Sequence, residues 1–383
     1  MRNRSLPARQ AAARRAGGVL TVRGPARSRG TPLSIPRPGT MTRAKAPLRV
    51  SFCGGGTDIA EYFCEHGGGV VLNATITKYA YATLVSRDDQ RIILRSVDYG
   101  SELRYNHGEA IAYDGDLDLA KAAITRIGVP SGVELFLHTD APPGSGLGSS
   151  STLTAAIIGA FQEHFKLPPN PYHTAELAYA VEREELGLHG GKQDQYAAVF
   201  GGINFIEFFP DRTIVNPLRL RPNVINELQY RLVLYYTGRS RVSGKIIEDQ
   251  IRSFTRRDGD VLAALHETKQ LTVALKQALL LGDLDEMGRI LHDAWQVKQR
   301  FSSLIAFAGV EDIYTAARAN GAIGGKLLGA GGGGYMLFLC ANDARQKLVD
   351  TLRRFGGAVE PLAFELEGIQ SWQPALTENA PEA

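Results

Sequence analysis

The segment that most constrains the fold runs from Asp140 to Ser151 and reads Asp-Ala-Pro-Pro-Gly-Ser-Gly-Leu-Gly-Ser-Ser-Ser. A strand pattern at residues 133–138 precedes it, and a helical pattern at residues 150–166 follows it. Three glycines at alternate positions let the backbone approach a ligand closely. Because the first N–H groups and the dipole of a helix attract anions, the segment is typical of a phosphate-binding turn. It is not a Walker A loop, since no Gly-Lys-Ser/Thr follows, and a flexible loop with a serine cap is the alternative.

Two more glycine-rich turns stand out. Residues 329–334 match G-x-G-x-x-G, but an apolar strand pattern follows where a dinucleotide-binding turn needs a helix. This context argues against a nicotinamide enzyme and leaves either a turn beside a ligand or a plain tight turn. Residues 54–58 read Gly-Gly-Gly-Thr-Asp. The hydroxyl and carboxylate at the end of this turn can bind sugar hydroxyls or cap the turn itself.

Strand and helix patterns alternate along the chain, which predicts a mixed α and β fold. The expected strands cover residues 48–52, 70–84, 92–97, 133–138, 203–209, 232–236, 335–340 and 359–365. The expected helices cover residues 120–127, 150–166, 172–186, 258–281, 284–300, 311–320 and 344–355. Three prolines interrupt the pattern around residues 211–226, which predicts a domain boundary there.

The positive charge of the chain is concentrated at its start. The 383 residues carry 43 Lys plus Arg and 40 Asp plus Glu, a formal net charge of +3. Residues 1–40 hold nine Arg and no Lys, Asp or Glu, which leaves 34 basic and 40 acidic residues, a net charge of −6, in the rest. The basic balance therefore gives no support to nucleic-acid binding by the whole protein. Residues 1–40 are predicted to be a disordered Arg-rich extension: a dispensable segment upstream of a start at Met41, a targeting segment, or a basic arm.

Several classes of protein can be set aside. No run approaches 18 consecutive apolar residues, which argues against a membrane span, and the apolar stretch at residues 18–22 is too short for a secretory signal. Cys53, Cys64 and Cys340 are too few and too scattered for a disulfide framework, and none are spaced as C-x-x-C. We therefore expect a reduced, cytoplasmic protein without a thiolate metal site and without a nucleic-acid or membrane partner.

In this order, the three turns resemble those of the GHMP kinase superfamily, which includes galactokinases, homoserine kinases and mevalonate kinases. The resemblance covers about residues 46–369, and the run Pro-Pro-Gly-Ser-Gly-Leu-Gly-Ser-Ser at 142–150 is its most specific part. Arg-Val-Ser-Phe at 49–52, together with the 54–58 turn and Gly-Lys-Gln-Asp-Gln-Tyr at 191–196, resembles the D-glycero-D-manno-heptose 7-phosphate kinases within this superfamily.

The resemblance implies an α+β fold of two parts with the active site between them. The first is a ribosomal-protein-S5-like, ATP-binding domain over residues 41–215. The second is a ferredoxin-like domain over residues 216–370, followed by a tail over residues 371–383.

The same resemblance implies an activity. It is the ATP- and Mg²⁺-dependent phosphorylation of the C1 hydroxyl of D-glycero-D-manno-heptose 7-phosphate to the 1,7-bisphosphate, for nucleotide-activated heptose and surface polysaccharide synthesis. The implied partners are ATP and a sugar phosphate, and a homo-oligomer is compatible with the family. Two alternatives stay open: another GHMP sugar-1-kinase that is fucokinase- or galactokinase-like, and a non-catalytic sugar or ATP sensor with the same fold.

The resemblance also assigns nucleotide and metal ligands. The residues that would wrap the ATP phosphates are Pro143, Gly144, Ser145, Gly146, Leu147, Gly148, Ser149 and Ser150. The Ser150 hydroxyl and the Glu182 carboxylate would bind Mg²⁺, which prefers oxygen ligands. Glu184 and Glu185 are close enough in the sequence that the metal carboxylate could be one of them instead.

Two residues match catalytic positions of the family. Asp194 would accept the proton of the attacking hydroxyl, or only orient that hydroxyl or cap a helix that begins near Gln193. Arg49 would lower the basicity of Asp194 and stabilise the transferring phosphoryl group. The alternative is that Arg49 merely begins a strand.

The remaining assignments concern the acceptor. Thr57 and Asp58, with Gly55 and Gly56, would bind sugar hydroxyls. The glycines that would flank the substrate and phosphates are Gly331, Gly332 and Gly333. The cationic candidates for the 7-phosphate are Lys192, Arg239, Arg241 and Lys245, and we expect Lys192 and Arg241 to be among its ligands.

Overall fold

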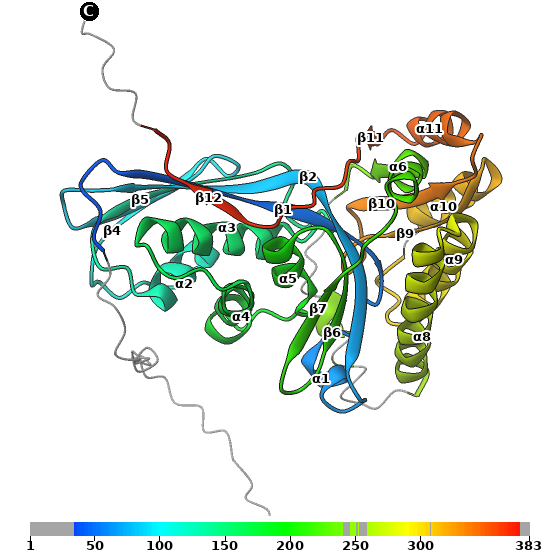
Figure 1. The fold of residues 1–383 in the computed structure, drawn as a ribbon, viewed down its shortest axis with the longest axis horizontal. Helices are drawn as coiled ribbons and strands as arrows, with labels where there is room; N and C mark the ends of the chain where they lie inside the picture. Colours follow the sequence, from blue (N-terminus) through cyan, green and yellow to red (C-terminus); the bar gives the residue numbers. More distant parts are fainter. Residues whose placement is uncertain (1–33, 240–245, 250–251, 253–258, 307, 376–383) are drawn as a thin grey trace, which may run out of the picture. The chain divides into compact units, whose positions relative to one another are not determined.

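The chain folds around two β-sheets (Figure 1). The structure is a computed structural model and describes residues 34–239, 246–249, 252, 259–306 and 308–375. The larger sheet contains β1 (Met41–Cys53), β2 (Gly69–Ser86), β3 (Arg91–Ser96), β4 (Ser101–Asn106), β5 (Val133–Thr139), β6 (Ile203–Phe208), β7 (Thr213–Pro217) and β12 (Gln370–Trp372). The smaller sheet contains β8 (Leu232–Tyr236), β9 (Ala322–Leu327), β10 (Tyr335–Cys340) and β11 (Ala358–Glu360).

The long strand β2 organises the larger sheet. Its first half, from Gly69 to Ala74, pairs with β6, and its second half, from Ala80 to Ser86, pairs with β5. The strand order is β12-β1-β2-β5-β3-β4, with β7 beside β6, and only β3 and β5 run parallel. The smaller sheet is antiparallel in the order β11-β8-β10-β9.

Helices cover the two sheets. They are α1 (Ala60–Phe63), α2 (Asp118–Ile127), α3 (Ser149–His164), α4 (Pro171–Ala180), the π-helical turn η1 (Val181–Glu185), α5 (Gln193–Phe200), α6 (Pro222–Arg231), α8 (Gly259–Leu281), α9 (Leu284–Gln299), α10 (Ala308–Ala319) and α11 (Arg345–Arg353). In Figure 1, α2, α3, α4 and α5 lie on one face of the larger sheet, and α3 packs directly on β1 and β2. α8 packs on β2 and on α9, and α9 packs on β9.

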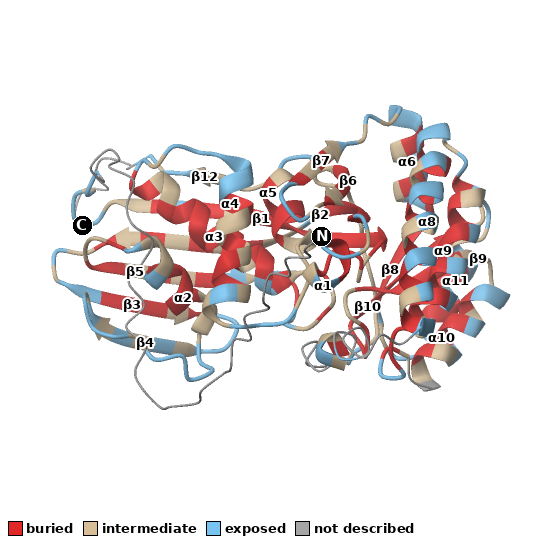
Figure 2. Cartoon of the chain, turned by 90° about the horizontal axis from the view of Figure 1, so that it is seen from below, coloured by how far each residue is buried: buried red, intermediate tan, exposed pale blue. Residues whose placement is uncertain are grey.

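The strand β10 shows why an unbroken apolar run belongs in the middle of a sheet. All six of its residues are buried. Leu337 and Leu339 pack with Leu291 of α9, whereas Met336 and Phe338 pack on the opposite face. Since successive side chains of a strand point to opposite faces, a strand covered on both faces needs apolar residues at every position. Figure 2 shows the contrast with the edge strand β4, in which intermediate and exposed residues alternate.

The structure differs from the sequence expectation at several elements. β1 begins at Met41 rather than near residue 48, and β9 was not expected at all. The expected last strand shortens to β11, and the chain then returns to the larger sheet, where β12 pairs with β1. β12 crosses the boundary predicted at residue 370, so residues 371 and 372 belong to a sheet and not to a tail.

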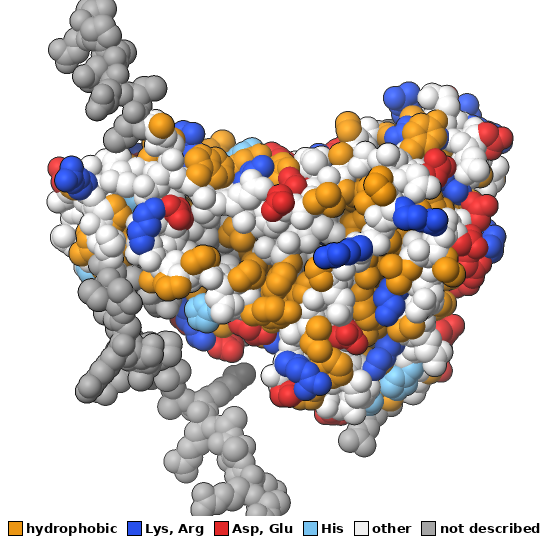
Figure 3. Space-filling model, in the orientation of Figure 1, with side chains coloured by type: hydrophobic (Ala, Val, Ile, Leu, Met, Phe, Trp, Pro, Cys, Tyr) orange, Lys and Arg blue, Asp and Glu red, His pale blue; other side chains and the backbone are white. Residues whose placement is uncertain are grey.

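The domain bounds at 41, 215 and 370 otherwise stay predictions. Residues 1–33 of the expected extension, and residues 376–383, lie outside the described residues. None of the helices that the structure describes combines the length and the apolar character that a membrane crossing requires. On the face shown in Figure 3, basic and acidic side chains are interspersed.

Candidate active site

The glycine-rich turn before α3 is held in a left-handed backbone conformation. Gly144, Gly146 and Gly148 have φ values of 71°, 86° and 78°, which favour glycine. Contact adds a second requirement, because a Cβ on Gly146 would lie 2.8 Å from the carbonyl oxygen of Leu328. The turn therefore packs against the residues that lead into the 329–334 turn, and no side chain caps the first turn of α3 at Gly148.

Two cavities meet beside this turn. The first, which we call the helix-end cavity, has a volume of about 540 Å³, and its walls include Pro143, Gly144, Gly146, Gly148, Ser149, Ser150, Ser151, Glu182, Leu188 and His189. The second, which we call the inner cavity, has walls that include Ser51, Gly55, Gly56, Asp58, Gly191, Gln193, Phe301, Lys298 and Lys326. The walls common to both are Arg49, Arg183, Asp194, Ile247, Gly329 and Ala330.

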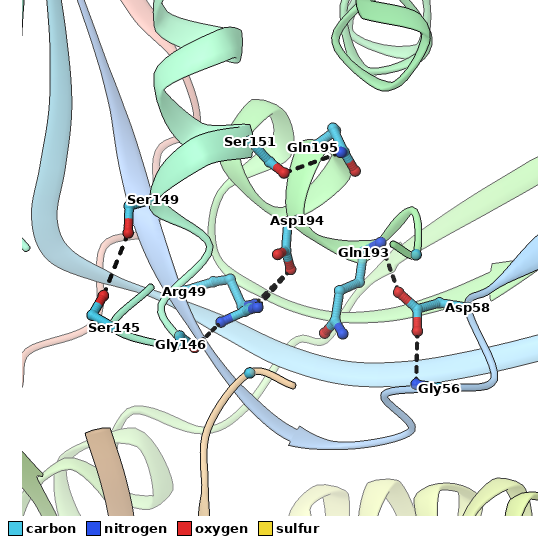
Figure 4. A network of polar contacts seen from close by, with 12 residues as sticks. Arg49, Gly56, Asp58, Ser145, Gly146, Ser149, Ser151, Gln193, Asp194 and Gln195 are labelled. Carbon is cyan, nitrogen blue, oxygen red and sulfur yellow. Dashed lines mark hydrogen bonds and ion pairs between the residues drawn. The ribbon is translucent and has the colours of Figure 1, made fainter. Parts of the chain in front are cut away.

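Arg49 and Asp194 line both cavities, and their side chains point toward each other (Figure 4). The Arg49 Nη2 and Nε atoms lie 2.7 and 2.8 Å from Oδ1 of Asp194, and Nη1 donates to the carbonyl oxygen of Gly146 at 2.6 Å. The Arg49 side chain is only 3% exposed, whereas that of Asp194, at the start of α5, is 23% exposed. The buried guanidinium thus holds a carboxylate that remains accessible from both cavities.

Asp58 is the second carboxylate of the inner cavity. It is buried and accepts hydrogen bonds from the backbone N–H groups of Gly56 (2.9 Å) and Gln193 (3.2 Å). Burial, and then the charge of Asp194, raise the pKa of this carboxyl. Gly191 must be glycine here, because a Cβ would lie 1.9 Å from Oδ2 of Asp58.

Glu182 lies at the floor of the helix-end cavity, on the π-helical turn η1. It is 1% exposed, and it accepts hydrogen bonds from the Ser151 hydroxyl at 2.8 Å and from the Gln195 amide. Burial raises its pKa. The neighbouring glutamates face elsewhere: Glu184 pairs with Arg126 and Glu185 accepts from the Tyr113 hydroxyl.

Several expected ligands lie outside the cavities. Thr57 is fully buried, and its hydroxyl donates to the carbonyl oxygens of Gly54 and Val70, so it stabilises the turn instead of facing a sugar. The side chains of Ser145 and Leu147, within the phosphate-binding turn, are buried and line neither cavity. The carbonyl oxygen of Ser145 accepts from the N–H group of Tyr335, which joins the turn to the smaller sheet.

In the glycine-rich turn at 329–334, too, only some of the residues line a cavity. Gly329 and Ala330 line both cavities. The expected ligands Gly331, Gly332 and Gly333 line neither of them. The N–H group of Gly332 donates to Ile305.

The residues expected to bind the 7-phosphate of the sugar are not found on the cavity walls that the structure describes. The Lys192 ammonium binds the Glu176 carboxylate at 2.9 Å and lines neither cavity. Arg241 and Lys245 lie outside the described residues.

A third, more apolar cavity of about 550 Å³ adjoins the helix-end cavity. It shares Pro143, Ser149, Ser150 and Leu188 with that cavity. Its other walls include Tyr99, Tyr113, Leu117, Leu137, Leu153 and Leu186. An anion-attracting helix end thus lies beside a cavity with aromatic and aliphatic walls. Asp98, Asp116, Asp118 and Glu185 also line that cavity.

Comparison with known proteins decides the family. Residues 117–202 match the GHMP kinases N terminal domain, and residues 275–358 match the GHMP kinases C terminal domain. Over 337 residues the chain is 42% identical to D-glycero-alpha-D-manno-heptose 7-phosphate kinase of Campylobacter jejuni, covering 86% of this chain and 98% of that protein. The chain belongs to the GHMP kinase family. It is thus a phosphotransferase with an alcohol group as acceptor, in a family that uses ATP as the phosphoryl donor.

Other GHMP kinases share the fold. The structure of a D-glycero-D-manno-heptose 1-phosphate kinase from Bacteroides thetaiotaomicron is 35% identical with a TM-score of 0.72, covering 87% of this chain and 99% of that one. A bifunctional fucokinase/GDP-fucose pyrophosphorylase of Arabidopsis thaliana is 29% identical over 80% of this chain, which covers 31% of that longer protein. These similarities confirm the expected α+β GHMP kinase fold.

Sequence reasoning did not assign several polar residues that line this GHMP kinase site, among them Ser151, Arg183, Lys298 and Lys326. The sequence pattern of α9 does mark Lys298 as unusual. It occupies the apolar stripe of α9, seven residues after Leu291 and three after Trp295, where a charge is exceptional. Lys326 carried no such signal, because the strand that holds it was itself unexpected.

Proposed function

We propose that this GHMP kinase transfers the γ-phosphoryl group of ATP to the C1 hydroxyl of D-glycero-D-manno-heptose 7-phosphate, giving the 1,7-bisphosphate for nucleotide-activated heptose and surface polysaccharide synthesis. The observation that carries the proposal is the position of Asp194 on the wall common to the helix-end and inner cavities. A hydroxyl held in the inner cavity and a phosphoryl group held in the helix-end cavity would meet beside this carboxylate. The similarity to the Campylobacter jejuni enzyme supports the choice of acceptor.

The helix-end cavity and the adjoining apolar cavity support the proposed binding of ATP. The phosphates would lie at the start of α3, where Gly146, Gly148 and Ser150 line the helix-end cavity and the helix dipole favours negative charge. The base would lie in the adjoining apolar cavity, between walls such as Tyr99 and Leu186.

Magnesium binding fits the oxygen atoms of this wall. Glu182 is a desolvated carboxylate with one cationic partner, the Arg183 guanidinium at 3.3 Å. Burial raises the pKa of Glu182 in spite of this partner, so a metal cation would stabilise its charged form further. With the hydroxyls of Ser150 and Ser151 at the same helix end, it would supply the one or two protein ligands that Mg²⁺ takes beside phosphate oxygens and water. When bound, the ion would neutralise charge on the ATP phosphates.

The chemical step needs one proton acceptor and one stabilising cation. The C1 oxygen attacks the γ-phosphorus, the bond from that phosphorus to the β–γ bridging oxygen breaks, and ADP leaves. Asp194 accepts the proton of the C1 hydroxyl, while Arg49 keeps the carboxylate in place and stabilises negative charge on the transferring group. Asp58 would accept a hydrogen bond from a sugar hydroxyl in the inner cavity.

An acceptor panel tests the proposal. ADP release by the purified protein is measured with heptose 7-phosphate, unphosphorylated heptose, fucose and galactose at matched concentrations. We expect the highest kcat/KM for heptose 7-phosphate. A higher kcat/KM for fucose or galactose would contradict the proposed substrate, and the 29% identity to a fucokinase makes fucose the most informative comparison. Absence of turnover with all four sugars would contradict the proposed substrate as well.

A further inference from the structure

Two buried lysines face the inner cavity and have no part in the proposed proton transfer. Lys298 lies near the end of α9 and Lys326 lies in β9, and both are at most 9% exposed. The Lys298 ammonium donates to the carbonyl oxygens of Leu327 and Gly329, at 3.0 and 2.5 Å. The Lys326 ammonium donates to the carbonyl oxygen of Phe52 at 3.1 Å. Both line the inner cavity and neither lines the helix-end cavity.

The charges of these lysines are not balanced within the protein. Among the described residues, no carboxylate lies within ion-pair distance of either ammonium, whereas Arg49 on the same wall is paired with Asp194. Burial lowers the pKa of both lysines. The charges of Lys326 and then Arg49 lower that of Lys298 further, and Arg49 also lowers that of Lys326, whereas Cys53 has an opposing effect on both that is smaller than that of burial. Placing uncompensated cations next to one another in a buried wall is costly unless an anion joins them.

The hydrogen bonds of the lysines also leave capacity for a ligand. An ammonium has three N–H donors, and within the described part of the chain carbonyl oxygens accept two from Lys298 and one from Lys326. The contacts with carbonyl oxygens are compatible with a purely structural role, in which Lys326 joins β9 to the end of β1. Such a role needs a donor but not a charge, and it does not account for two ammonium groups facing one cavity.

We propose that Lys298 and Lys326 form a phosphate subsite in the inner cavity, for a phosphate monoester of the acceptor rather than a phosphate of ATP. The inference rests on the proposed function, because it takes the inner cavity as the acceptor side. It replaces Lys192, which is paired with Glu176, as the receiver of the distal phosphate. The phosphate has two possible sources: the distal phosphate of the incoming sugar, and the phosphate newly formed at C1.

The test compares Lys298→Met and Lys326→Met with the wild type. Lys269→Met is the matched control, because the Lys269 ammonium also donates to backbone carbonyl oxygens, those of Gly67 and Gly68, but lines neither cavity. KM and kcat are measured for heptose 7-phosphate, for unphosphorylated heptose and for ATP, together with Tm. Lys298→Gln, which keeps a donor for the carbonyls, is the second variant if Lys298→Met does not fold.

We expect each cavity variant to raise KM for heptose 7-phosphate by about tenfold or more, because a hydrogen bond to a charged group is lost. KM for unphosphorylated heptose and for ATP should stay at wild-type values, and Lys269→Met should change none of them. If kcat falls with both acceptors and inhibition by heptose 1-phosphate weakens, the new C1 phosphate is the source, and the subsite still holds. Unchanged kinetics with heptose 7-phosphate, or a fall in Tm with equal losses for both acceptors, would overturn it.

A thermal-shift measurement separates this inference from the proposed function. The wild-type protein is titrated with heptose 7-phosphate and with other sugar monophosphates, and the rise in Tm is recorded. If heptose 7-phosphate is not turned over but sugar phosphates raise Tm in the wild type and not in Lys298→Met, the substrate is wrong and the subsite stands. If sugar phosphates raise Tm equally in both proteins, the subsite is wrong whatever the substrate.

Discussion

At the scale of single residues, the site is arranged around one ion pair. Arg49 is buried and fixed by Asp194 on one side and by the carbonyl oxygen of Gly146 on the other. Because a guanidinium forms several hydrogen bonds in a fixed plane, it can hold the carboxylate and the phosphate-binding turn at the same time. This arrangement gives the proposed base a defined direction before any ligand arrives.

Replacement of the proposed base tests its role. Asp194→Asn should lower kcat about 100- to 10,000-fold, the usual range for loss of a general base, with KM for ATP unchanged. The amide can still accept a hydrogen bond from Arg49, so the fold should be retained, which circular dichroism checks. Glu176→Gln, at a surface carboxylate outside both cavities, is the control. A near-wild-type kcat in Asp194→Asn would show that the carboxylate only positions the acceptor.

Replacement of the proposed metal ligand tests the second carboxylate. Glu182→Gln should raise the Mg²⁺ concentration for half-maximal rate by about tenfold or more, since one anionic ligand is lost. Glu184→Gln is the control, because Glu184 pairs with Arg126 at the surface. The rate is measured as a function of free Mg²⁺ at saturating ATP. The same Mg²⁺ dependence in Glu182→Gln and the wild type would exclude Glu182 as a ligand.

At the scale of elements, the decisive feature is the packing of one glycine-rich turn against another. Gly146 lies against Leu328 and Gly329, and a Cβ on Gly334 would lie 2.1 Å from the carbonyl oxygen of Ser145. The turn before α3 comes from the larger sheet and the 329–334 turn from the smaller one. Backbone contact between them is what closes the wall common to the two cavities.

A Cβ at Gly146 should therefore disturb both stability and nucleotide binding. Gly128→Ala is the matched control, because Gly128 also has a positive φ, 70°, but open space around its Cα. The control should cost about 1–2 kcal/mol, the penalty for a left-handed residue alone. Gly146→Ala should cost more and should also raise KM for ATP. Denaturant unfolding and steady-state kinetics measure both, and equal free-energy losses with an unchanged KM would contradict the contact.

The sequence predicted those elements whose pattern is local. β10 was predicted because all six of its residues are apolar, and the start of α3 was predicted from the glycines and serines before it. β9, Ala-Ile-Gly-Gly-Lys-Leu, has no strand pattern of its own and forms because β10 pairs with it. Likewise, the cavity position of Lys326 and the contact of Glu182 with Ser151 depend on elements distant in the sequence, which no local pattern specifies.

At the scale of the whole molecule, buried polar groups join distant segments of the chain. His164, at the end of α3, lies between the Thr42 hydroxyl of β1 and the Ser86 hydroxyl of β2, each at 2.8 Å. It is 1% exposed, and burial lowers its pKa from 6.5 to about 4. Between pH 6.5 and about 4, this imidazole therefore stays neutral in the native fold but is protonated in the unfolded chain.

The depressed pKa of His164 predicts a pH dependence of stability. Its contribution is fully present above pH 6.5 and is lost as the pH falls toward about 4, because the unfolded state binds the proton first. The loss should reach about 3 kcal/mol over this window. His164→Gln should flatten the pH dependence of the unfolding free energy between these values, and the difference from wild type removes the contributions of other groups. Parallel curves for the two proteins would contradict the assignment.

The position at which phosphate is added tests the central claim most directly. Wild-type protein is incubated with ATP, Mg²⁺ and heptose 7-phosphate, and the product is followed by ³¹P NMR with coupling to the anomeric proton. We predict a second phosphate signal coupled to the proton on C1, growing in step with ADP and at least about 100-fold more slowly with Asp194→Asn. A new phosphate on any other carbon, or ADP formation without a new sugar phosphate, would contradict the account.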